Sequence, residues 1–161
     1  MLLPPNWRWR HQPLPPGPTV IFDIDGVLSD AAGRQHYLDA GREDWQAFFE
    51  SCGDDPLLEE VARLLDLLDS GLQVVLLTGR PMGVRAQTVA WLDRFEVRWD
   101  LLVMRDRLDH SRVAEYKRSV VEELRRHGMD LRLAFEDDPA NRDMLRSEGI
   151  PCVYIHSGYY E

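Results

Sequence analysis

The sequence predicts an α/β fold, a Rossmann-like three-layer sandwich whose central sheet is parallel. Short apolar runs alternate with segments whose apolar residues recur at helical spacing, as in repeated strand–helix units. The run at 72–77 is almost wholly apolar, which is typical of a strand buried on both faces. A length of 161 residues suits one domain with its own core.

Residues 19–161 are expected to form this domain, after a proline-rich arm at 1–18. The arm is expected to be extended, with polyproline character, and Trp7 and Trp9 could dock it onto the domain. The pattern predicts strands at 19–22, 72–77, 100–104, 131–135 and 151–155. It predicts helices at 45–49, 57–68, 84–95, 111–127 and 139–149.

Two side chains are predicted to cap helices at their N-termini. Ser111 stands where its hydroxyl can cap the helix that begins there. Asp138 precedes Pro139, and this pair is typical of an N-cap followed by the first helical position. Gly128 and Gly149 are expected to end these two helices.

The composition limits the classes of protein to which this chain can belong. The formal net charge of −9 argues against a protein that coats nucleic acid, so a nucleic-acid substrate would be held locally, at one end. No apolar run approaches the roughly 20 residues of a membrane helix, and no signal-peptide core is present, so we expect a cytoplasmic protein. Cys52 and Cys152 form neither a disulfide framework nor a zinc motif.

Acidic and hydroxyl side chains directly follow three of the predicted strands. The segments are 23–26 (DIDG), 78–80 (TGR) and 136–138 (EDD). Ligands of parallel α/β sheets bind beyond the carboxyl ends of the strands, so these segments are expected to meet at one edge. Their coincidence favours a functional site over the alternative that the aspartates merely cap turns.

Asp23 and Asp25 stand two residues apart, so extended backbone would point both carboxylates the same way. Asp137 would bring a third negative charge to the same edge. Such a cluster requires a cation, and oxygen ligands select a hard ion such as Mg²⁺. Asp23, Asp25 and Asp137 are therefore the candidate ligands of a magnesium ion.

Four ordered motifs resemble those of the haloacid dehalogenase (HAD) superfamily: DIDGV, LLTGR, a lysine on a later helix, and FEDD. The resemblance extends from Thr19 to Tyr160. It implies a phosphatase in which Asp23 is the nucleophile that takes the phosphoryl group as an aspartyl-phosphate. It also implies that Asp25 first protonates the leaving oxygen and then activates water, and that its main-chain carbonyl contacts the metal. The dehalogenases lack this second aspartate, because halide leaves without a proton, so its presence favours hydrolysis of a phosphate ester.

The resemblance implies roles for further residues of the same motifs. Thr78, with the N–H of Gly79, would hydrogen-bond the phosphoryl group, and Asp137 would be the distal metal ligand. Lys117 would neutralise the charge between nucleophile and phosphate, although a solvated lysine on the helix surface is the alternative. The role of Glu136 stays open.

The intervals between the motifs leave no room for a large cap domain, so an open site is expected to admit a large substrate. The stretches 78–92, 101–117 and 134–155 are similar to the phosphatase domain of bacterial and phage polynucleotide kinase–phosphatases, which removes 3′-phosphate from nucleic-acid ends. Several arginines there could bind backbone phosphates, or be solvated surface residues: Arg80, Arg85, Arg105, Arg107 and Arg112.

These observations leave three functions open. The first is a Mg²⁺-dependent phosphatase for 3′-phosphorylated nucleic-acid ends, and the second is a phosphatase for nucleotides or other small phosphate esters. The third is a binding module with a silent site, which the intact motifs disfavour. No GxxxxGK[ST] loop occurs, so a separate kinase or ligase subunit could act with this chain. No membrane partner is expected.

Overall fold

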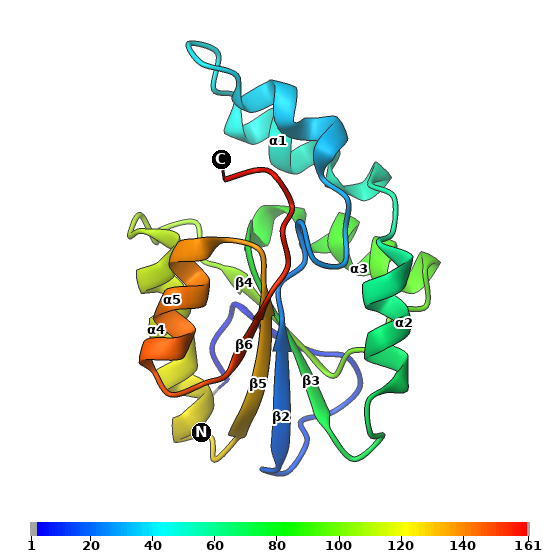
Figure 1. Cartoon of the computed structure of the whole chain (residues 1–161), viewed down its shortest axis with the longest axis vertical. Helices are drawn as coiled ribbons and strands as arrows, with labels where there is room; N and C mark the ends of the chain where they lie inside the picture. Colours follow the sequence, from blue (N-terminus) through cyan, green and yellow to red (C-terminus); the bar gives the residue numbers. More distant parts are fainter. Residues whose placement is uncertain (1–2, 161) are drawn as a thin grey trace.

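Residues 3–160 are described by the computed structural model and form one six-stranded sheet with helices on both faces (Figure 1). The strand order is β1-β4-β3-β2-β5-β6, and only the pair β1–β4 is antiparallel. The strands are β1 (Trp7–Trp9), β2 (Pro18–Phe22), β3 (Gln73–Pro81), β4 (Leu101–Arg105), β5 (Asp130–Glu136) and β6 (Cys152–Tyr154). The α-helices are α1 (Trp45–Glu50), α2 (Glu59–Leu67), α3 (Arg85–Arg94), α4 (Val113–Arg126) and α5 (Pro139–Ser147). Short 3₁₀ helices are η1 (Ala32–Leu38), η2 (Ser51–Asp54) and η3 (Met82–Val84).

The central strand β2 separates two hydrophobic cores. Val20 and Phe22 face the core that the sheet shares with α2 and α3, whereas Ile21 faces the core shared with α4 and α5. Successive residues of a strand point to opposite faces, and all three side chains are buried. This arrangement confirms the predicted three-layer α/β sandwich.

All five predicted strands are present, and β3 alone differs markedly in its bounds. It continues through the TGR motif to Pro81, instead of ending at Leu77. Its register with β4 shifts between Leu77 and Pro81, so the motif leaves the regular ladder. An irregularity of this kind re-aims side chains at a sheet edge.

The strand β1 has no counterpart in the sequence prediction. It pairs with β4, with Trp7 opposite Val103, and Trp7 packs in the core beside α4 and α5. The prolines around it hide any alternating pattern, and its partner strand is far along the chain. The expected docking of the arm through tryptophan is therefore made by a strand.

One of the two predicted helix caps is confirmed. The side chain of Asp138 accepts a hydrogen bond from the N–H of Ala140, 2.9 Å away, at the start of α5. The prediction for Ser111 was wrong, because α4 begins later, with Arg112 at its N-cap position. The hydroxyl of Ser111 instead donates to Asp109 in the preceding turn.

A small helical lobe at residues 32–54 contains η1, α1 and η2 and stands over the carboxyl edge of the sheet (Figure 1). Arg34 donates to the carbonyl of Phe48 at 2.9 Å within the lobe. It fastens the lobe to the edge of the sheet, because it also pairs with Asp25 and with Asp55, each at 2.7 Å. The prediction of no large cap domain is confirmed for the described residues. The short helix predicted at 45–49 is α1.

Other sequence interpretations concern the cysteines and the membrane. Cys52 and Cys152 are buried free thiols. Across residues 3–160, no helix is both long and apolar enough to cross a bilayer.

Candidate active site

The end of β2 lies where the connections of the sheet change direction. From β2 the chain adds β3 and β4 on one side, and later β5 and β6 on the other. Such a switch point opens a crevice beyond the carboxyl ends of the strands. Asp23 follows β2, Thr78 lies in the last part of β3, and Asp137 follows β5, so the predicted segments reach the same edge.

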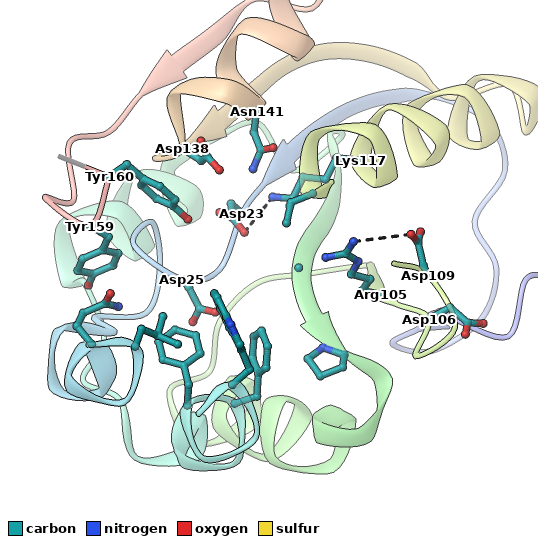
Figure 2. A pocket seen from close by; sticks show the side chains of 18 of the residues that line it. Asp23, Asp25, Arg105, Asp106, Asp109, Lys117, Asp138, Asn141, Tyr159 and Tyr160 are labelled. Atoms are coloured by element: carbon teal, nitrogen blue, oxygen red, sulfur yellow. Dashed lines mark ion pairs between the residues drawn. The ribbon is translucent and has the colours of Figure 1, made fainter. Parts of the chain in front are cut away.

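Asp23 is buried beside Lys117, which α4 delivers to the crevice (Figure 2). The Nζ of Lys117 lies 3.2 Å from Asp23 Oδ1 and 2.8 Å from Glu136 Oε2. Burial and the charge of Glu136 raise the pKa of Asp23 well above its usual value, against the effect of Lys117. Burial alone would lower the pKa of Lys117, but the two carboxylates raise it. Lys117 is thus a buried cation, and the alternative of a solvated surface lysine was wrong.

Three carboxylates at this edge could hold a metal ion. One oxygen from each of Asp23, Glu136 and Asp137 lies within 4.8 Å of the others. Glu136 is already bound by Lys117 and by the backbone N–H groups of Asp137 and Asp138. Neither carboxylate oxygen of Asp137 makes a hydrogen bond of normal geometry within residues 3–160. Burial and the charge of Asp23 raise the pKa of Asp137 to about 8, against the smaller effect of the nearby Ser157 hydroxyl. A buried carboxylate without a well-formed hydrogen bond, beside a second carboxylate, fits a divalent cation.

Gly26 keeps the space in front of Asp137 open. Its φ of +80° lies in the left-handed region, which glycine adopts without strain. A Cβ at this position would lie 2.0 Å from Asp137 Oδ2. Any other residue here would collide with the carboxylate that is free to bind a cation.

The side chain of Asp25 does not belong to the cluster of three carboxylates that could hold a metal ion. This corrects the expectation that it points the same way as Asp23. Asp25 Oδ1 lies 2.7 Å from Nη2 of Arg80 and 2.7 Å from Nη2 of Arg34. Burial would raise the pKa of Asp25, but the charges and hydrogen bonds of these arginines outweigh it and lower the pKa. Arg80, predicted to bind substrate phosphate, is fully buried behind Asp25.

Arg34 is a site residue that the sequence reasoning missed. It lies on η1, is buried, and joins Asp25 to Asp55, which closes the lobe. The polar segment at 30–55 has no periodic pattern that singles out this arginine. The acidic pair Asp54–Asp55 lies in the same polar segment, but its sequence does not show that Asp55 pairs with Arg34.

A cavity of about 560 Å³ opens above these groups. Asp23, Asp25 and Lys117 form its floor (Figure 2). The helical lobe supplies an apolar wall, and Arg105 lies on one flank of the cavity while Tyr159 and Tyr160, in the tail that follows β6, lie on the other (Figure 2). The side chains around the cavity include Gln35, Leu38, Trp45, Phe48, Phe49, Arg105, Asp106, Arg107, Asp109, Asp138, Asn141, Tyr159 and Tyr160. The expected open site therefore has an aromatic side wall.

The remaining predicted site residues separate into those that line this cavity and those that do not. Gly79 and Arg107 line it. Thr78 lies just beneath, and its hydroxyl accepts a hydrogen bond from the N–H of Arg80 at 3.0 Å. Arg85 is not a lining residue, because its guanidinium donates to the carbonyl of Pro5 at 2.8 Å and so holds the N-terminal arm.

Carboxylates gathered around one buried lysine at the switch point of a parallel sheet are suited to phosphoryl transfer. The chain is a phosphatase domain of the HAD superfamily. Within this superfamily it belongs to the family described as the polynucleotide kinase PNKP phosphatase domain, whose pattern matches residues 17–160. No curated protein matches the chain.

Solved structures agree with this assignment. A chain of the Pnkp1/Rnl/Hen1 RNA repair complex is 27% identical, with a TM-score of 0.76 over 94% of this chain and 46% of that one. A second chain from a Pnkp1/Rnl/Hen1 complex is 28% identical, with a TM-score of 0.74 over 93% of this chain and 50% of that one. This chain thus spans about half the length of both. The class C acid phosphatase from Bacillus anthracis, at 14% identity, 89% and 67% coverage and a TM-score of 0.65, shares the fold.

Proposed function

We propose that this chain is a Mg²⁺-dependent phosphomonoesterase that removes 3′-phosphate from nucleic-acid ends through an aspartyl-phosphate on Asp23. The observation that carries the proposal is the contrast between two aspartates that line one cavity. Asp23 lies against Lys117, whereas Asp25 is held by Arg80 and Arg34. Two carboxyl groups in different environments can take different roles, one as nucleophile and one as proton carrier.

In the first half of the reaction, a carboxylate oxygen of Asp23 attacks phosphorus and the bond to the leaving oxygen breaks. Asp25 gives its proton to that oxygen. The pKa of Asp25 is low in the free protein, and the nearby charge of a bound phosphate would raise it. In the second half, Asp25 takes a proton from water, the water oxygen attacks phosphorus, and Asp23 leaves as a carboxylate with release of inorganic phosphate.

Other groups of the chain would stabilise the charge that develops on the phosphoryl oxygens. The ammonium of Lys117 lies beside the nucleophile, and the N–H of Gly79 and hydroxyl of Thr78 are the donors we assign to the phosphoryl group. Mg²⁺, held by Asp23, Asp137 and the main-chain carbonyl of Asp25, would offset the repulsion between carboxylate and phosphate.

The nucleic-acid substrate is supported by the family and by the shape of the site. The similar solved chains belong to complexes that contain Pnkp1, and one of these is an RNA repair complex. A cavity lined by aromatic side chains and arginines suits a base and its phosphates. We also propose that the chain acts with a separate protein of the kinase or ligase type, since both solved complexes combine Pnkp1 with Rnl and Hen1.

Phosphate release with Mg²⁺ would test the proposal. The substrates are a 3′-phosphorylated oligonucleotide, the 5′-phosphorylated equivalent, mononucleotides and an aryl phosphate, with Asp23→Asn as the inactive control. We expect strong preference for the 3′-phosphorylated strand and loss of activity in chelator. Turnover confined to mononucleotides or aryl phosphate would assign the chain to small phosphate esters instead. Phosphate release by Asp23→Asn at the wild-type rate would reject the nucleophile.

A further inference from the structure

A second cavity of about 610 Å³ adjoins the one above Asp23. Four residues line both cavities and form their junction: Trp45, Phe49, Pro81 and Arg107. The second cavity is otherwise lined by Gln46, Glu50, Gly83, Val84 and Gln87. The two cavities together make one groove that leads from the reacting carboxylate to the outer side of the lobe. A small phosphate ester would need only the first of them.

The junction contains exposed aromatic surface. Trp45 is 52% exposed, which is unusual for a large apolar side chain with no partner on its outer face. Its ring stacks on Phe49 with centroids 5.9 Å apart, and Phe49 in turn packs against Phe48 at 5.2 Å. The three rings support one another on α1, so the indole is held in place as a flat platform.

The junction also contains an available cation. Arg107 has neither an ion-pair nor a hydrogen-bond partner within residues 3–160. Arg105, on the wall of the first cavity, differs because it pairs with Asp109 at 3.7 Å and donates to the carbonyl of Ser111. The single acid that lines the second cavity, Glu50, accepts a hydrogen bond from Gln46 at 2.8 Å. Arg107 is thus free to bind a phosphodiester, for which the guanidinium fork is well suited.

We propose that this groove holds the last two nucleotides of a single-stranded, 3′-phosphorylated nucleic acid. The terminal nucleotide occupies the first cavity, the penultimate nucleotide occupies the second, and Arg107 binds the phosphodiester between them. Bases stack on the Trp45 and Phe49 platform, which requires unpaired bases. This inference rests on the proposed 3′-phosphatase function and specifies how that site would distinguish an oligonucleotide from a mononucleotide.

A length series measures the second subsite directly. The kcat/KM of the wild-type protein is compared for a nucleoside 3′-phosphate, a dinucleotide 3′-phosphate and a trinucleotide 3′-phosphate at one Mg²⁺ concentration. We expect a gain of about 10-fold from one to two nucleotides, as one stacked base supplies, and little further gain from two to three. A dinucleotide without its penultimate base should lose most of that gain and keep the part due to the phosphodiester.

Substitutions at the junction test whether its residues cause the rise in kcat/KM from one to two nucleotides. Trp45→Leu and Arg107→Gln should each lower the ratio of dinucleotide to mononucleotide kcat/KM, and Trp45→Phe should restore much of it. Gly83 lines only the second cavity and has free space where a Cβ would lie. Gly83→Glu should lower the ratio by repelling the phosphodiester, whereas Gly83→Gln, its uncharged match, should lower it less. Leu67→Ala is the control, because Leu67 is exposed on α2 and lines neither cavity.

The outcomes separate this inference from the proposed function. If only the aryl phosphate is hydrolysed, the 3′-phosphatase function fails and the inference fails with it. Equal kcat/KM values for one, two and three nucleotides would leave the function intact and overturn the second subsite. A 3′-phosphate at a blunt duplex end that reacts as fast as the single strand would overturn the unpaired occupant.

Discussion

Arg80 reaches Asp25 from a fully buried position, with its Nη2 2.7 Å from Oδ1, while the side chain of Asp25 is 21% exposed. The Nε of Arg80 lies 3.2 Å from both oxygens of the same carboxylate. The arginine therefore holds Asp25 from behind and leaves its front edge to the cavity. A charged side chain that touches no substrate can in this way set the position of one that does.

Replacing Arg80 by lysine tests this positioning. Arg80→Lys keeps the charge but loses the planar fork. We expect kcat to fall about 100-fold, since a displacement of about 1 Å in a reacting group can have that effect. Steady-state kinetics measure it, with Arg125→Lys as the control, because Arg125 pairs with Glu148 on the surface at 3.1 Å. A wild-type kcat in Arg80→Lys would contradict the positioning role.

Lys117 allows stability and activity to be separated. Lys117→Met leaves Asp23 and Glu136 buried without their cation, so we expect a loss of about 3–5 kcal/mol in the free energy of unfolding. Adding Glu136→Gln removes one of these charges and should recover part of the stability. Activity should stay lost in both variants, because the charge beside the nucleophile is absent. Denaturant unfolding and phosphate release check the two effects, and a double variant that regains activity would reject the role of Lys117.

The role of Asp137 as a metal ligand can be tested by the effect of Mg²⁺ on the stability of the protein. Mg²⁺ at about 100 times its dissociation constant should stabilise the wild-type protein by about 2.7 kcal/mol, seen as a raised Tm. Asp137→Asn should abolish most of this shift. Without metal the variant should be about as stable as the wild type at neutral pH, because the raised pKa of about 8 leaves Asp137 largely uncharged there and the amide has the same shape. Asp143→Asn, on the exposed side of α5, is the control, and an equal Mg²⁺ response in Asp137→Asn would exclude Asp137 as a ligand.

Gly26 offers a test that separates backbone strain from the site. Gly26→Ala and Gly149→Ala place a Cβ at similar φ values, +80° and +79°, so each should lose about 1 kcal/mol of stability from the left-handed backbone. Gly149 has nothing within 4 Å of such a Cβ, whereas at Gly26 it would meet Asp137. Only Gly26→Ala should therefore lose phosphatase activity and the Mg²⁺-dependent rise in Tm. Equal activity in the two variants would contradict the collision with Asp137.

The local pattern of apolar residues was sufficient to predict the strands that have one or both faces buried. The strands β2 to β6 contain apolar runs or alternating apolar residues. The helix cap at Asp138 was predictable because a short acidic side chain before a proline readily accepts a hydrogen bond from the first turn of a helix. The strand β1 was missed because three residues among prolines give no period, and its pairing with β4 depends on the tertiary structure. Ser111 failed as a cap because α4 begins one residue later than expected, with Arg112 at its N-cap position.

The sequence could predict which motifs meet at the active site, but it could not predict the different surroundings of Asp23 and Asp25. The sequence could place Asp23 and Asp137 at one edge, because strand ends meet there, whereas Lys117 was assigned to the site only through the resemblance to the superfamily. It could not show that Asp25 turns away from Asp23, since this depends on Arg34, which a segment without regular pattern brings back to the sheet. The aromatic platform at Trp45 was hidden for the same reason, because a six-residue helix is too short to reveal which face it buries.

The pairing of β1 with β4 has a consequence for solubility. Leu101 to Met104 of β4 are fully buried apolar residues, and β1 covers the row of backbone donors and acceptors on their outer side. Without that cover, β4 would become a free hydrophobic edge that could recruit the same strand of another molecule. The opposite edge of the sheet is the three-residue strand β6, which is too short to recruit partners well. The tryptophan-containing strand therefore protects the phosphatase from edge-to-edge aggregation, and trimming it should turn a dispersed enzyme into a self-associating one.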